Sequence, residues 1–156
     1  MDNTGTVFKG AVSGEDDHLN SIEKIIGSNY KDIIKADSNS TISFVFEAGS
    51  GNDTLQAGKG NDYLYGQGGD DTIITDLHTT PRSGSTSAKI EGDLLIDGGE
   101  GFDTLILSGD NNIDFSIFSD GKNAADRISN IEAIDLTNGD HDLKNLRLDD
   151  VLNMTG

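Results

Sequence analysis

The sequence predicts an all-β fold built from short strands and tight turns, and three observations support this fold class. A nine-residue pattern occurs four times between residues 48 and 106. Glycine is abundant, with 20 residues against a single proline, and 22 of the 28 acidic residues are aspartate, which favours turns and metal sites over helix interiors. Only 33% of the 156 residues are hydrophobic, so we expect one domain with a thin core.

The repeat is defined by glycine at its fourth place, aspartate at its sixth, and leucine or isoleucine at its eighth. Glycine permits the positive φ angles and the close backbone approach of a tight turn. The eighth-place side chain points inward from a three-residue strand. Carboxylate and carbonyl oxygens together are the ligands that a hard cation such as Ca²⁺ prefers. The four copies are residues 48–56, 57–65, 66–74 and 98–106.

Residues 1–47 are expected to form degenerate coils ahead of these copies. Residues 27–34 keep an aspartate, Asp32, and an aliphatic residue at the right places, but they lack two of the glycines. Asp32 therefore stays open between a metal ligand and a turn residue. Residues 21–26 and 41–47 alternate between polar and apolar side chains, which predicts short strands.

Two copies of the repeat make one coil of 18 residues, so each turn is expected to stack on the turn two copies later. Residues 48–53 would then lie against residues 66–71, with a calcium ion between Asp53 and Asp71. Residues 57–62 would lie on the opposite edge of the coil.

The pattern breaks at residues 76–92, a polar stretch that holds the single proline and predicts a surface loop. Asp71 and Asp103 are 32 residues apart, which is one 18-residue coil plus 14 additional residues. If the loop leaves from the opposite edge, residues 93–97 return as a strand and residues 98–103 stack on the third copy. A second calcium ion would then lie between Asp71 and Asp103.

Residues 107–156 are expected to form a C-terminal cap of a single domain spanning 1–156. The alternating residues 130–135 predict a strand, and residues 148–154 predict a short helix with acidic residues in its first turn.

These motifs resemble the parallel β-roll of RTX proteins, which are bacterial products of type I secretion. Residues 130–139 (NIEAIDLTNG) and 146–152 (LRLDDVL) are similar to a segment near the C-terminus of giant bacterial adhesins, including biofilm and ice-binding adhesins. The resemblance covers roughly residues 20–156. It implies a right-handed parallel β-roll that is unfolded in the low-calcium cytosol and folds after export.

The resemblance also implies a ligand set for two or more calcium ions. Ala48, Ala57 and Gln67 replace glycines of the repeat, at little expected cost where only a carbonyl oxygen is used. The implied side-chain ligands are Asp53, Asp62, Asp71 and Asp103. The implied backbone ligands come from the turns that contain Gly49, Gly51, Gly58, Gly60, Gly66, Gly69, Gly99 and Gly101.

The function that follows is a calcium-binding structural module of a secreted adhesin, extracellular or on the bacterial cell surface. Its expected partners are the neighbouring domains of the parent protein and the type I secretion machinery in transit, and the module is expected to be a monomer. Two alternatives stay open. One is a module that binds ice, a glycan or a peptide, for which Thr54, Thr72 and Thr104 would line one sheet. The other is the accessory RTX module of a secreted enzyme.

Composition argues against several other classes of function. The formal charge of −17 leaves no basic patch for nucleic acid, and no apolar stretch approaches the ~20 residues of a membrane span. There is no cysteine for a disulfide or a thiolate zinc site. His18, His78 and His141 share no zinc spacing, and no Gly-x-Ser-x-Gly motif is present, so no enzymatic activity is expected.

Overall fold

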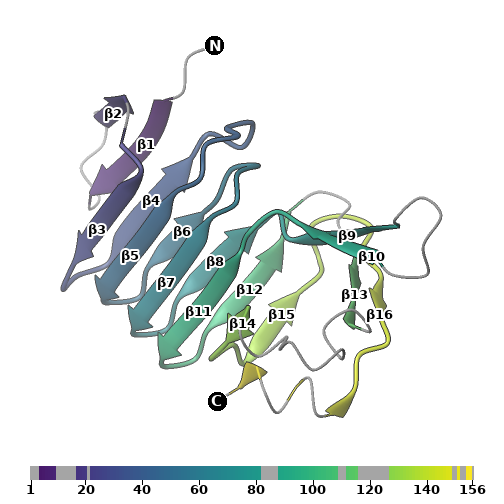
Figure 1. Cartoon of the computed structure of the whole chain (residues 1–156). Coiled ribbons are helices and arrows are strands. Elements are labelled where there is room, and N and C mark those ends of the chain that lie inside the picture. The colour runs from purple at the N-terminus through teal and green to yellow at the C-terminus, as the bar shows by residue number, and fades with distance from the viewer. Residues whose placement is uncertain are drawn as a thin grey trace.

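The computed structural model describes residues 4–9, 17–20, 22–81, 88–108, 112–115, 127–148, 151 and 154–155. Within them the chain passes repeatedly between two facing sheets, and successive coils stack side by side (Figure 1). The strands of successive coils pair in parallel. The prediction of an all-β parallel β-roll is confirmed.

The larger sheet of the described chain has seven strands in the order β15-β12-β8-β6-β4-β1-β2. These strands are, in that order, Ala133–Asp135, Thr104–Leu107, Thr72–Thr75, Thr54–Gln56, Asp32–Ala36, Thr4–Lys9 and Asp17–Asn20. The facing sheet has five strands in the order β14-β11-β7-β5-β3. Its strands are Ile128–Ser129, Leu95–Glu100, Tyr63–Gly68, Val45–Ser50 and Lys24–Ser28.

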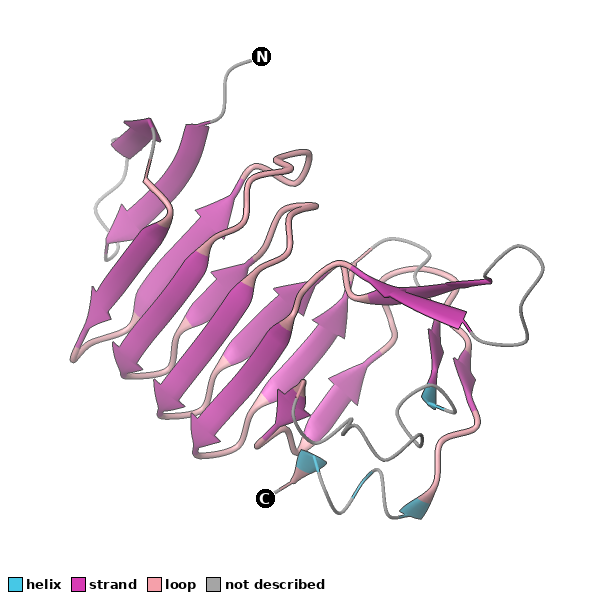
Figure 2. Cartoon of the chain, viewed as in Figure 1, coloured by secondary structure: helices cyan, strands magenta, loops and turns pink. Residues whose placement is uncertain are grey.

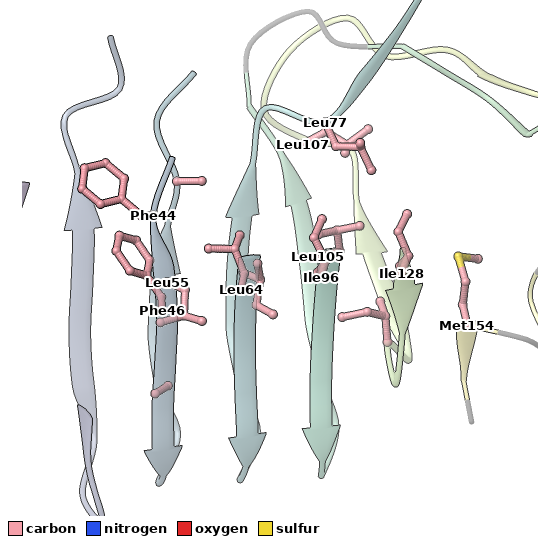
Figure 3. Close-up of a cluster of buried hydrophobic side chains, with 14 of the residues drawn as sticks. Phe44, Phe46, Leu55, Leu64, Leu77, Ile96, Leu105, Leu107, Ile128 and Met154 are labelled. Atoms are coloured by element: carbon pink, nitrogen blue, oxygen red, sulfur yellow. The ribbon is translucent and has the colours of Figure 1, made fainter. Parts of the chain in front are cut away.

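The core is a narrow row of buried side chains that lies between the two sheets and follows the direction in which the coils stack (Figure 3). In the larger sheet the eighth-place residues Leu55, Ile73 and Leu105 pair in register and are fully buried. Phe46 and Leu64 stack in the same way in the facing sheet. Because a three-residue strand such as β6 buries one side chain, this core is as thin as the low apolar content predicts.

The N-terminal end of the roll differs from the predicted degenerate coils. Strands β3 and β4 do form a coil, but β1 pairs antiparallel with β4, and β2 pairs antiparallel with β1. The first 20 residues hold no complete set of the repeat's glycine, aspartate and aliphatic places, so nothing in them directs a parallel coil. The antiparallel pair instead covers the edge of β4.

The predicted surface loop at residues 76–92 contains a hairpin. Strand β9 (His78–Pro81) pairs antiparallel with β10 (Ala88–Glu91), and the pair projects from the side of the roll (Figure 1). Proline is tolerated in β9 because β9 is an edge strand of a two-stranded sheet. The chain then returns as β11, which pairs in parallel with β7.

The C-terminal segment adds irregular elements to the end of the roll. Strands β14 and β15 extend the two sheets, and β13 (Ile113–Asp114) forms a small parallel pair with β16 (Leu143–Lys144). Leu148, Val151 and Met154 are helical (Figure 2), whereas the remainder of the predicted helix, 149–150 and 152–153, lies outside the described residues. In the described part of the chain no helix is long and apolar enough to cross a membrane.

Candidate metal centre

The turns of the repeat stack in the register that its spacing predicts. Gly49 pairs with Gln67, and Gln67 pairs with Gly99 on the next coil. Asp53, Asp71 and Asp103 follow these positions, so the fold brings the three carboxylates into one row along one edge of the roll. All three side chains are buried.

Each carboxylate in this row is held by the coil before it. The backbone N–H groups of Asp32, Asp53 and Asp71 donate to Oδ1 of Asp53, Asp71 and Asp103, each at 2.7 Å. The backbone N–H of Asp103 donates to Oε2 of Glu132 at 2.8 Å. This ladder fixes the orientation of every carboxylate and uses one oxygen of each.

The second oxygen of each carboxylate is left over. Oδ2 of Asp53, Asp71 and Asp103 is buried and accepts no hydrogen bond. An unsatisfied buried polar atom costs about 1–3 kcal/mol, and a charged one costs more. All three atoms belong to acidic residues of one row. A cation in front of them would explain why they lack hydrogen-bond partners.

Glycine keeps open the space in front of these oxygens. A Cβ atom placed on Gly66 would overlap both Oδ2 of Asp71 and the carbonyl oxygen of Gly98. A Cβ atom placed on Gly98 would meet Oδ2 of Asp103 at 2.5 Å and overlap the carbonyl oxygen of Asn130. A carboxylate oxygen and a carbonyl oxygen of the next coil therefore lie close together beside each of these glycines, and these donors fit Ca²⁺.

Backbone oxygens are essential to this donor set. Within the described ranges, no three histidine, cysteine, aspartate or glutamate side chains gather at one point. A cation in the row would therefore be held by one or two carboxylates together with carbonyl oxygens of adjacent turns, which is the oxygen-rich coordination that suits calcium.

The turns of the row depend on left-handed backbone conformations. Gly51, Gly69 and Gly101, at the fourth place of the repeat, have φ angles of 129°, 122° and 136°. Residues other than glycine rarely adopt such angles. Gln67 has φ 75°, so the expectation that this residue replaces glycine at little cost is wrong. A left-handed conformation costs a non-glycine residue roughly 1–2 kcal/mol.

Asp62 lies apart from the row, on the opposite edge. Its side chain is fully buried, and its Oδ1 accepts the backbone N–H of Phe44 at 2.6 Å, while Oδ2 has no hydrogen-bond partner. The predicted backbone ligands Gly58 and Gly60 are in the same turn and pack against carbonyl oxygens of residues 37–42. The fold thus separates this predicted ligand from the other three.

Asp32, at the start of the row, behaves as a turn residue. Its Oδ2 accepts hydrogen bonds from the backbone N–H of Ser28 at 2.5 Å and from the Ser28 hydroxyl at 2.8 Å. This oxygen is already satisfied by the protein, in contrast to the equivalent atoms of Asp53, Asp71 and Asp103. Of the two interpretations of Asp32, the structure favours the turn.

The repeat is also recognised by comparison with known families. Residues 47–77 match the family model of the RTX calcium-binding nonapeptide repeat (4 copies). This segment carries RTX calcium-binding repeats. No curated protein and no solved structure matches the chain. The RTX match covers the first three copies, and the structure stacks the fourth copy, residues 98–106, on the third.

Three residues that continue the roll beyond the matched segment were missed from the sequence. Asn130 takes the place of a repeat glycine with φ 52°, and Glu132 takes the place of the next aspartate in the ladder. Neither carries a signal of the repeat beyond the alternation that predicts their strand. Asp93 follows Gly92 directly, so it departs from the repeat spacing, although a Gly-Asp pair before an aliphatic run was a usable signal.

Burial sets the protonation of the row. Removal from water, helped by the neighbouring carboxylates of Asp53 and Asp103 and opposed by the Asp53 N–H, raises the pKa of Asp71 from its ordinary 3.8 to about 6. Burial also raises the pKa of Asp53 and of Asp103. Ionising the row therefore costs more free energy than ionising free aspartates, unless positive charge is supplied.

These shifts predict that the cation-free protein becomes less stable as pH rises from about 4 to about 7. Asp71 binds a proton more tightly in the folded chain than in the unfolded chain, so its contribution is fully present below pH 3.8 and is lost as pH rises through about 6. The loss is roughly 3 kcal/mol at most for Asp71. Far-UV circular dichroism of metal-stripped protein across this range measures it, as a β signal that falls when the pH rises. A stability that increases between pH 5 and pH 7 would contradict this assignment.

Proposed function

We propose that this chain is a calcium-dependent structural module of a secreted bacterial adhesin, which folds on calcium binding after type I secretion. The observation that carries the proposal is the row of buried, unsatisfied oxygens on Asp53, Asp71 and Asp103. These oxygens lie in RTX calcium-binding repeats or stack directly on them. The similarity of residues 130–139 and 146–152 to an adhesin segment supports the kind of parent protein.

The physical basis of the proposal is the balance between a thin core and a concentrated charge. The chain carries a formal charge of −17, and its buried aspartates oppose folding as long as they are ionised without a partner. Bound calcium supplies the missing positive charge. Its binding free energy then becomes folding free energy, so the chain is extended and exportable without calcium and rigid with it.

The affinity expected of such sites suits this switch. Extracellular calcium modules bind at about 10⁻⁴–10⁻³ M, a range that separates the low-calcium cytosol from the outside of the cell. The proposal accordingly places the folded module outside the cell or on its surface, as a monomer between neighbouring domains of the parent. It assigns no catalysis to these residues.

The structural role can be tested by measuring the end-to-end distance of the chain with and without calcium. With a fluorescent domain fused at each end, calcium is expected to convert a broad distribution of end-to-end distances into a single narrow one, measured by single-molecule energy transfer. A length distribution that calcium leaves unchanged would contradict the proposal. The same fusion carrying Asp71→Asn is the matched control, because it should need more calcium to narrow.

The alternative of a ligand-binding module has one observation in its favour. Thr54, Thr72 and Thr104 pair in register in the larger sheet, as expected. The column continues with Ile33 on one side and Ala133 on the other, and its threonines are half-buried. A three-residue threonine column is small for a docking face, so the structural module is the better-supported function.

A further inference from the structure

The structure places two buried carboxylates together at the base of the β9–β10 hairpin. Asp62 ends a repeat turn, and Asp93 stands where the chain re-enters the roll after the hairpin. Asp62 is 0% exposed and Asp93 is 1% exposed. The two side chains are within hydrogen-bonding reach of each other, although they are 31 positions apart in the sequence.

Each carboxylate again has one oxygen that is engaged and one that is not. Oδ1 of Asp62 accepts the backbone N–H of Phe44, and Oδ2 of Asp93 accepts the hydroxyl of Thr75. Oδ2 of Asp62 and Oδ1 of Asp93 are buried with no hydrogen-bond partner. In the described part of the chain neither carboxylate forms an ion pair with a lysine or arginine.

The backbone around the pair is fixed by the return of the chain. The N–H groups of Leu94 and Leu95 both donate to the carbonyl oxygen of Asp62, at 2.8 and 3.3 Å. The Thr75 hydroxyl that donates to Asp93 itself accepts the backbone N–H of Leu77 at 2.9 Å. Both ends of the excursion, residues 75–77 and 93–95, are therefore bonded to the residues that present the carboxylates.

We propose that Asp62 and Asp93 bind a divalent cation that fastens the base of the β9–β10 hairpin to the roll. Two buried carboxylates held side by side repel each other unless a cation or a shared proton lies between them. The two leftover oxygens are hard donors on separate segments, which suits Ca²⁺. This site differs from those of the row because Asp93 lies outside the repeat.

The inference rests on the proposed calcium-dependent function, and ion counting separates the two. Asp93→Asn keeps the shape of the side chain and an acceptor for Thr75 but removes the charge. The variant is expected to bind one calcium ion fewer per chain than the wild type, counted by equilibrium dialysis, and still to fold in calcium. Asp70→Asn is the matched control, because Asp70 is exposed and its Oδ1 accepts the backbone N–H of Phe102; it should keep the full count.

A second measurement uses the wild-type chain and does not depend on the folding of a variant. Replacing calcium with paramagnetic Gd³⁺ is expected to broaden the amide resonances of Leu94 and Leu95, which lie beside the pair. The row oxygens lie beside Gly98, three to four residues along the strand and roughly 10–13 Å from these amides. Because broadening falls with the sixth power of distance, an ion held by Asp62 and Asp93 should broaden them far more than an ion in the row.

The outcomes are distinguishable. An unchanged ion count in Asp93→Asn, together with Leu94 and Leu95 resonances broadened no more than the row ions alone would cause, would overturn this site and leave a shared proton as the link between the two carboxylates, while the row and the proposed function would stand. A wild-type chain that binds no calcium would overturn both.

Discussion

Asp71→Asn is expected to have opposite effects on stability with and without calcium. The Asn Oδ1 can still accept the Asp53 N–H, as Asp71 does at 2.7 Å. The amide NH₂ would replace the unsatisfied Oδ2 and face the carbonyl oxygen of Gly98. Without calcium the variant should therefore be more stable than the wild type at pH 7, by up to about 3 kcal/mol. With calcium it should be less stable, since a cation site has lost its charged ligand.

Calcium affinity is the second readout for this variant. Asp71 lies between two stacked turns and faces two predicted sites. We therefore expect the calcium concentration at the midpoint of folding to rise by about tenfold or more, which is the lower end of the affinity losses seen when metal sites are disturbed. Asp70→Asn, which removes the adjacent exposed charge, should change the midpoint far less. A variant that loses the same stability with and without calcium would mean that Asp71 has only a structural role. A larger midpoint change for Asp62→Asn than for Asp71→Asn would contradict the shared position of Asp71.

Gly66→Ala is expected to close one cation site, whereas Gly68→Ala in the same strand is expected to be nearly silent. A Cβ atom on Gly66 would overlap Oδ2 of Asp71 and the carbonyl oxygen of Gly98. On Gly68 the nearest atom would be the Gly49 carbonyl oxygen at 3.9 Å, an ordinary contact. Neither glycine has a positive φ angle, so the pair isolates the effect of placing a side chain against these oxygens.

The expected size of the Gly66→Ala effect is about 1–3 kcal/mol from overpacking, together with the loss of the calcium dependence that this site contributes. Gly68→Ala should stay within roughly 0.5 kcal/mol of the wild type. Chemical unfolding of both variants over a series of calcium concentrations above the folding midpoint separates the two contributions. Equal behaviour of the two variants would mean that the space in front of Asp71 has no role in binding.

The repeated part of the fold could be predicted from the sequence because each place of the repeat has a separate physical task. The eighth-place residues Leu55 and Ile73 had to face the core, and the coil length of 18 residues fixed which turns stack. The position of the second strand of that coil, and with it the row of Asp53 and Asp71, followed from spacing alone. Residues 98–103 were placed correctly because the excursion returns the chain to the same register.

The parts that could not be predicted are those where tertiary contacts take over a task of the repeat. Glu132 completes the aspartate ladder with a longer side chain, and Asn130 adopts a glycine conformation without being glycine. The contact between Asp62 and Asp93 depends on the path of the excursion, which spacing does not determine. The antiparallel strand β1 likewise forms because β4 presents an edge, not because its own sequence repeats.

The central claim, that calcium binding and folding of this roll are coupled, is tested most directly by titrating metal-stripped protein with Ca²⁺ and, separately, with Mg²⁺ at pH 7. Far-UV circular dichroism follows the gain of β structure. We expect a cooperative transition with calcium at about 10⁻⁴–10⁻³ M and little change with magnesium, which demands six-coordinate geometry and gives up its water reluctantly. A chain that already has its full β signal in chelator, and whose thermal unfolding calcium leaves unchanged, would contradict the claim.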